Sequence, residues 1–136
     1  MTKFTGFALL ASTVAFAAGS VSAAELNIYT TREPGLIQPL LESFTASSGV
    51  KVNTVFLKDG LAERVLSEGA SSPADVLMTV DAGNLVDLAE KGVTQAVESE
   101  TLTKAVPAEL RDAKGHWFAL SMRARVLYAA KDVDLA

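Results

Sequence analysis

The pattern that most constrains the fold is an alternation of strand patterns with helical patterns along the chain. Strand patterns occupy Glu25–Tyr29, Val50–Leu57 and Asp75–Val80, and a helical pattern follows each of them. A glycine stands where each helical pattern stops, as Gly49 does for the first. This order predicts an α/β fold with an open, mostly parallel sheet and helices on both faces. In such sheets ligands bind beyond the carboxyl ends of the strands.

Apolar spacing predicts which helix faces are buried. The first helical pattern has one apolar strip: Leu36, Ile37, Leu40, Leu41 and Phe44. The second helical pattern predicts three residues that face the core: Leu61, Val65 and Leu66. Pro39 is expected near the first turn of its helix, where a missing N–H costs little. Asp81 is placed to cap the third helix, which makes a cap a better interpretation of this carboxylate than a metal ligand.

The pattern is mixed after residue 92. The stretches "SETLTKAV" and "PAELRDA" predict two short helical turns. The stretch "HWFALSMRARVLYAA", residues 116–130, predicts a long β-rich segment that the polar "SMRAR" interrupts. The chain then stops within what looks like a new strand and turn, so we expect it to be a piece of a longer protein.

The amino terminus has the features of a secretory signal. One cation, Lys3, precedes an apolar run, and "VSA" ends at Ala23 with small residues at the two positions that a signal peptidase requires. We expect cleavage after Ala23 and export to the periplasm; the alternative is an uncleaved membrane anchor, for which the apolar run is short. Eleven basic residues remain against 16 acidic ones, without a basic cluster, which argues against a nucleic-acid partner. The chain has no cysteine, which excludes disulfides and thiolate metal sites.

The stretch "TTREP" is a polar joint between the first strand and the first helix. Thr30 and Thr31 offer hydroxyls, Arg32 offers a guanidinium fork, and Glu33 offers an oxygen ligand. The N–H groups at the start of the helix, near residues 35–37, are expected to be unpaired and to favour an anion. The alternative is structural, with Thr31 capping the helix and Arg32 pairing with Glu33 on the surface.

The stretch "SMRAR" is the second polar joint. Alternation along a strand would place Arg123 and Arg125 on the same side as Ser121. Two arginines on one side of a strand could bind an anion. The alternative is an ion pair with one of three carboxylates: Asp75, Asp81 or Glu33.

The remaining candidates favour structural roles. His116 is the only histidine and is expected in a turn, and Tyr29 is expected to pack. No nucleophile elbow, phosphate-binding glycine loop or pair of histidines occurs in the sequence, so it predicts a protein that is not an enzyme.

The stretches "SEGASSPADVLMTVD" and "WFALSMRARV", following the exported "LNIYTTRE", closely resemble the amino-terminal half of periplasmic ferric-ion-binding proteins. These proteins are the substrate-binding components of iron ABC transporters. The resemblance implies a periplasmic-binding-protein-like lobe of a two-lobed, hinged monomer that closes on Fe³⁺ and delivers it to an inner-membrane permease. It also implies a small synergistic anion, such as carbonate or phosphate. The adjacent tyrosines that hold iron in the family come from the second lobe, and no Tyr-Tyr pair occurs here.

The resemblance carries over to few residues. Glu33 stands where the family commonly has histidine and would be an oxygen ligand for iron. Val80 stands where a second family carboxylate falls and cannot ligate. Arg32 and Arg123, with Thr30 and Thr31, are expected to bind the anion. We expect residues 24–126 to form the first lobe and residues 127–136 to begin a crossover to the second. The alternatives are a binder of a small oxyanion or other solute with the same fold, or a truncated remnant that binds nothing.

Overall fold

The computed structural model describes residues 24–124, 126, 128, 130 and 131. The predicted signal peptide, Arg125 and most of the predicted crossover lie outside these residues. Helices and strands follow one another in the order β1 (Glu25–Thr30), α1 (Pro34–Ser48), β2 (Lys51–Phe56), α2 (Leu61–Glu68), β3 (Val76–Met78), α3 (Ala82–Glu90) and α4 (Glu100–Ala105). Short 3₁₀ turns occupy Gly69–Ser71 and Ala108–Leu110. None of the helices in the described part has the length and apolar character that spanning a bilayer requires.

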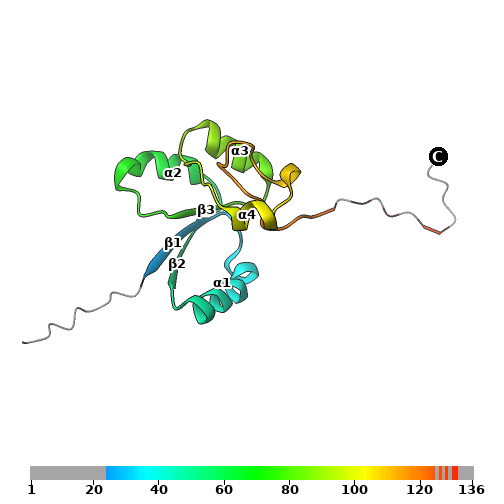
Figure 1. The fold of residues 1–136 in the computed structure, drawn as a ribbon, viewed down its shortest axis with the longest axis horizontal. Coiled ribbons are helices and arrows are strands. Elements are labelled where there is room, and N and C mark those ends of the chain that lie inside the picture. Colours follow the sequence, from blue (N-terminus) through cyan, green and yellow to red (C-terminus); the bar gives the residue numbers. More distant parts are fainter. Residues whose placement is uncertain (1–23, 125, 127, 129, 132–136) are drawn as a thin grey trace, which may run out of the picture.

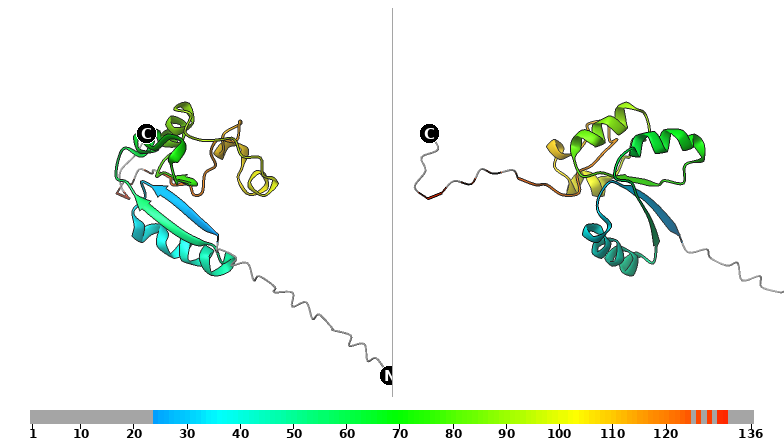
Figure 2. Two further views of the ribbon diagram at one scale, coloured as in Figure 1. Left: turned by 90° about the vertical axis from the view of Figure 1, so that its left-hand side faces the viewer. Right: turned by 180° about the vertical axis from the view of Figure 1, so that it is seen from behind.

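The three strands form a parallel sheet in the order β2-β1-β3, so β1 is the central strand. Helix α1 lies on one side of the sheet, and α2 and α3 lie on the other (Figures 1 and 2). This arrangement confirms the predicted α/β fold with an open parallel sheet and helices on both faces. The register places Thr30 opposite both Phe56 and Met78, so all three strands end at the same edge of the sheet.

Two apolar clusters hold the layers together, one on each face of β1. Ile28 packs with Ile37 and Leu41 of α1. The next residue, Tyr29, packs with Leu61 and Ala62 of α2 and with one leucine of α3, Leu88. Successive residues of a strand point to opposite faces, which is why neighbours in the sequence belong to different clusters.

Helix α1 buries less of its apolar strip than the spacing predicts. Ile37 and Leu41 are buried, but Leu36 is 70% exposed and Leu40 is 50% exposed. Only the two residues that face Ile28 are covered, because the three-stranded sheet contacts a narrow stripe of the helix. Pro39 lies in the second turn of α1, further into the helix than predicted. Gly49 ends the helix in the left-handed conformation, as expected.

Helix α2 corrects a second detail of the predicted core. Leu61 is buried and Val65 packs against the same cluster, as predicted, but Leu66 is 51% exposed. Ala62 takes the inward position instead. Leu66 follows Val65 by one residue and therefore lies about 100° further around the helix, away from the sheet.

Helix α3 begins with the predicted cap. The Asp81 Oδ1 atom accepts a hydrogen bond of 2.9 Å from the Asn84 backbone N–H, and Oδ2 accepts one of 2.9 Å from the Asn84 side chain. We expect Asp81→Ala to lower the free energy of unfolding by about 1 kcal/mol, because the first-turn N–H loses its acceptor. Urea denaturation measures this change. Glu90→Ala, at the other end of the same helix, is the control and should leave stability nearly unchanged; equal losses would contradict the capping role.

The segment after residue 110 corrects the prediction of a long β-rich stretch. Within the described residues it forms one isolated antiparallel bridge, between Arg111 and Phe118, and residues 119–124 form no strand. An alternating pattern becomes a strand only where another strand offers a hydrogen-bonding edge, and the described part pairs no strand with these residues. The predicted shared face of Ser121 and Arg123 therefore does not arise from a strand. The two short helical turns predicted before it are confirmed as α4 and the second 3₁₀ turn.

Candidate functional site

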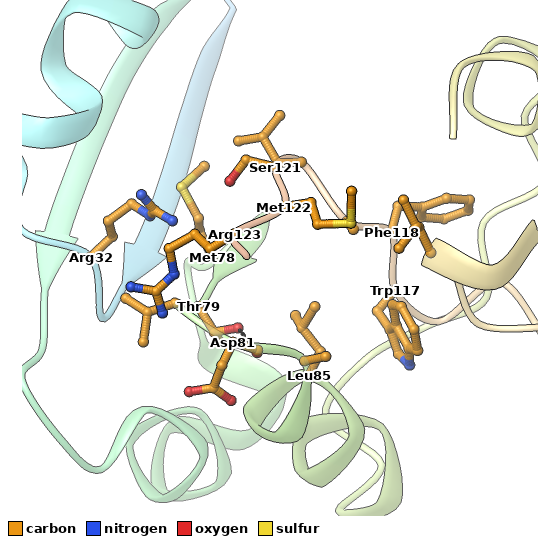
Figure 3. A pocket seen from close by; sticks show the side chains of 15 residues that line it. Arg32, Met78, Thr79, Asp81, Leu85, Trp117, Phe118, Ser121, Met122 and Arg123 are labelled. Carbon is orange, nitrogen blue, oxygen red and sulfur yellow. Dashed lines mark hydrogen bonds between the residues drawn. The ribbon is translucent and has the colours of Figure 1, made fainter. Parts of the chain in front are cut away.

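A cavity of about 350 Å³ lies where the chain leaves β1 and β3. Most of its lining comes from three segments, which are the β1–α1 joint, the β3–α3 joint and the stretch 117–123; Leu85 of α3 and Leu110 complete it. Arg32 comes from the first segment and Arg123 from the third, and both side chains lie at the same end of the cavity, with Trp117 and Phe118 at the other end (Figure 3). The fold thus brings together two arginines that are 91 residues apart in sequence.

The two arginines have no carboxylate partner in the described part of the chain. No ion pair there involves Arg32 or Arg123, although Asp81 lines the same cavity. Both Asp81 oxygens accept hydrogen bonds from Asn84, and Asp75 accepts from the backbone and the side chain of Asn27. The predicted alternative, an ion pair of these arginines with a carboxylate, is therefore absent among the residues described. The cavity offers two guanidinium groups to a solute.

Thr30 is the last residue of β1 and does not line this cavity. It has no exposed surface, and its Oγ1 accepts a hydrogen bond of 2.9 Å from the Arg32 backbone N–H. A side chain with no exposed atom cannot touch a solute, so this geometry does not support the expected direct contact of Thr30 with an anion. The sequence correctly places this stretch between a strand and a helix, but the first of its hydroxyls points into the protein.

Thr31 lines a second cavity, of about 430 Å³, together with charged residues such as Glu63 of α2, Asp87 of α3 and Lys91, which follows α3. Its Oγ1 is buried and has no hydrogen-bond partner within the described residues. Thr79 and Val80 line both cavities, so the two hollows adjoin at the end of β3. The predicted anion-binding residues therefore lie in three places. Arg32 and Arg123 line the first cavity, Thr31 lines the second, and Thr30 is buried at the end of β1.

Glu33 occupies the N-cap position of α1 and is exposed. No side chain caps this helix, so the predicted alternative of a Thr31 cap is wrong. The Leu36 N–H donates to the Glu33 carbonyl at 3.0 Å, which corrects the expectation that all the first-turn amides are free. Glu33 lines neither cavity. Nowhere in residues 24–124, 126, 128, 130 and 131 do three or more carboxylate or imidazole side chains gather in a way that could hold a metal ion.

Two residues expected to be structural are structural. Tyr29 is buried in the core, and its hydroxyl donates to Glu68 Oε1 at 3.1 Å. Burial raises the pKa of Tyr29, and hydrogen bonds from Ser72 and Arg64 lower the pKa of Glu68. His116 lies in a turn, where its Nδ1 is 3.0 Å from the Thr94 hydroxyl.

The sequence did not single out the two aromatic residues of the cavity, Trp117 and Phe118. They begin the stretch "WFALSMRARV", which carries the family resemblance, but the sequence assigned neither of them a role in the site. They give the cavity an apolar end opposite the arginines (Figure 3). A solute that fits this hollow therefore meets charge on one side and aromatic surface on the other.

Comparisons with known proteins agree on one family of relatives. The chain is 47% identical over 104 residues to iron uptake protein A1 of Synechocystis, covering 76% of this chain and 29% of that protein. It is 34% identical over 130 residues to the major ferric iron-binding protein of Neisseria gonorrhoeae, covering 89% of this chain and 37% of that protein. No family model matches the chain. The chain thus spans about a third of the length of the curated relatives it matches.

Solved structures give the same result. A Bordetella ferric binding protein is 65% identical, with a TM-score of 0.77, over 82% of this chain and 35% of that one. A Trichodesmium protein in complex with iron and citrate ligands is 46% identical, with a TM-score of 0.66, over 70% of this chain and 30% of that one. These matches define the chain as an α/β lobe of the kind found in ferric binding protein structures. The chain is homologous to ferric iron-binding periplasmic proteins over about a third of their length. These relatives are named for iron binding and uptake, which bears out the prediction of a non-enzymatic protein.

Proposed function

We propose that the chain forms the first lobe of a periplasmic binding protein that captures ferric iron together with a small anion such as carbonate. In this proposal residues 1–23 direct export, residues 24–126 form the lobe, and residues 127–136 begin the crossover to a second lobe. The protein is a monomer that delivers iron to the permease of an ABC importer in the inner membrane. The identity of 65% with a ferric binding protein supports the cargo.

The observation that carries the anion half of this proposal is the meeting of Arg32 and Arg123 in one cavity without a described carboxylate partner. Two cations confined in a hollow repel each other, and an oxyanion that accepts from both guanidinium forks relieves this repulsion. The anion in turn offsets the charge of Fe³⁺ and offers it oxygen ligands. The Thr31 hydroxyl, buried without a described partner in the adjoining hollow, is a further donor for a water that the anion holds.

Glu33 is the proposed iron ligand of this lobe. Its carboxylate is exposed and follows Arg32 directly, so it can meet an ion held between two lobes. A hard oxygen ligand suits Fe³⁺. One carboxylate does not make a ferric site, so the remaining ligands would come from outside the described residues. In the family that the sequence resembles, adjacent tyrosines of the second lobe are such ligands.

Ferric titration of the protein expressed from its whole gene tests this function. With bicarbonate present, we expect a visible tyrosinate-to-iron charge-transfer band that saturates at one iron per protein. Without bicarbonate or another synergistic anion, the band should be weak, because the arginine charges are then uncompensated. Glu33→Ala should weaken iron binding, and Glu42→Ala, an exposed carboxylate on α1, is the matched control. A protein that gives no band in either condition would contradict the ferric cargo.

One observation favours a second candidate, a binding protein for a small oxyanion without metal. The described residues place two arginines in the cavity but no group of metal-ligating side chains. Calorimetric titration with carbonate, phosphate and sulfate in the absence of iron separates the two functions. Tight binding of an oxyanion alone, with no response to ferric ion, would support this candidate over the first.

A further inference from the structure

Thr30 is held more firmly than any other residue of the polar joint. It ends the central strand, and its carbonyl accepts a hydrogen bond of 2.8 Å from the Leu57 N–H, beyond the end of β2. The following N–H, that of Thr31, donates to the Met78 carbonyl of β3 at 3.0 Å. The chain is therefore tied to both neighbouring strands up to this point, and it becomes free to turn only at Arg32.

The Thr30 side chain governs that turn. Its hydroxyl oxygen accepts from the N–H of Arg32, two residues further on, which closes the local turn that threonine commonly forms. This bond satisfies a backbone donor that lies against a fully buried side chain. It also fixes the direction in which Arg32 leaves the strand, and this direction leads to the cavity that Arg123 also lines.

We propose that Thr30 is a positioning residue for Arg32: its buried hydroxyl holds the backbone of Arg32 so that the guanidinium meets an oxyanion shared with Arg123. This inference rests on the proposed function, since it assigns Thr30 a part in the same anion site. Preorganisation of this kind strengthens binding because the anion does not have to order the turn itself. The role requires a hydroxyl at residue 30 but no contact between that hydroxyl and the anion.

A double-mutant cycle in the protein expressed from its whole gene tests the role. Thr30→Val keeps the shape of the side chain and removes the acceptor, and Thr30→Ser restores the acceptor. We expect Thr30→Val to raise the dissociation constant of carbonate about five- to tenfold, as the loss of one hydrogen bond does. Thr30→Ser should stay within about twofold of the wild type. In an Arg32→Ala background, Thr30→Val should change carbonate binding by less than about twofold, because the residue to be positioned is gone.

The outcomes separate this inference from the proposed function. If Arg32→Ala weakens carbonate binding and Thr30→Val does not, the positioning role is overturned and the anion site stands. If Thr30→Val weakens binding equally with and without Arg32, Thr30 acts through the fold and not through Arg32. If Arg32→Ala itself has no effect, the anion site is overturned and the positioning role falls with it.

A measurement on the unaltered protein tests the proposal even if the Thr30→Val variant fails to fold. Hydrogen exchange at the Arg32 amide should be slowed strongly relative to an unstructured peptide, because that N–H is bonded to a buried oxygen. The Arg123 amide lies outside any described helix or strand and serves as an internal comparison. An Arg32 amide that exchanges at the rate of an unstructured chain would overturn the proposal without any substitution.

Discussion

If the proposed anion site holds carbonate, Arg123→Ala is expected to raise the dissociation constant of carbonate about ten- to hundredfold. In the proposed site the guanidinium donates charge-assisted hydrogen bonds to the anion, and bonds to charged groups contribute about 1.5–3 kcal/mol each. Each 1.4 kcal/mol corresponds to a tenfold change in the constant. Arg32→Ala should have an effect of the same size, because the two side chains enter one cavity from different segments.

Calorimetry of carbonate binding to the protein expressed from its whole gene measures this change, and the ferric titration should show a matching loss of anion-dependent iron binding. Arg123→Lys keeps the charge but not the planar fork, so it should recover only part of the affinity. Lys104→Ala removes one positive charge from exposed α4 and controls for long-range electrostatics. A Lys104 effect as large as that of Arg123 would mean that net charge, and not the cavity, decides affinity.

The local order of elements could be predicted from the sequence because it depends on spacing alone. The apolar residues Ile28 and Tyr29 stand next to each other, and the strand geometry sends them to opposite faces, each against its own helix. The αL glycine after α1 and the Asp81 cap of α3 are likewise local features that the sequence states directly.

The predictions that failed concern residues whose burial or strand pairing depends on a distant part of the chain. The strip on α1 has the right spacing, yet Leu36 and Leu40 are exposed because the sheet reaches only the stripe that includes Ile37. The alternation around Arg123 suits a strand, but the described residues pair no strand with it. Periodicity reports which faces are apolar and does not report what covers them.

In the candidate site, too, some features could be predicted from the sequence and others could not. Sheet topology alone predicts that the joint after β1 and the joint after β3 meet at one edge, and the cavity that Arg32 shares with Asp81 lies there. Sequence could not show that Thr30 turns inward to its own backbone while Thr31 faces the neighbouring cavity. The two hydroxyls differ because the Thr30 hydroxyl accepts a hydrogen bond from the Arg32 N–H and the Thr31 hydroxyl has no such bond. This bond depends on the position of the end of β1 between β2 and β3.

Leu88→Ala is expected to lower the free energy of unfolding by about 2–5 kcal/mol. Leu88 is 2% exposed and packs from α3 against Tyr29, Leu61 and Ala62. Its truncation removes apolar contact between α3, α2 and the central strand, and a cavity remains where the surrounding side chains cannot close. Since natural domains are stable by about 5–15 kcal/mol, this single change removes a large part of the total.

Leu66→Ala is the matched control, with the same pair of residue types on a helix of the same layer. Leu66 is 51% exposed, so its truncation should change stability by no more than about 0.5 kcal/mol. Urea denaturation, followed by the fluorescence of Trp117 beside α3, compares the variants under one condition. Equal destabilisation by the two substitutions would contradict a core built on Leu88, and with it the packing that holds α3 beside the site.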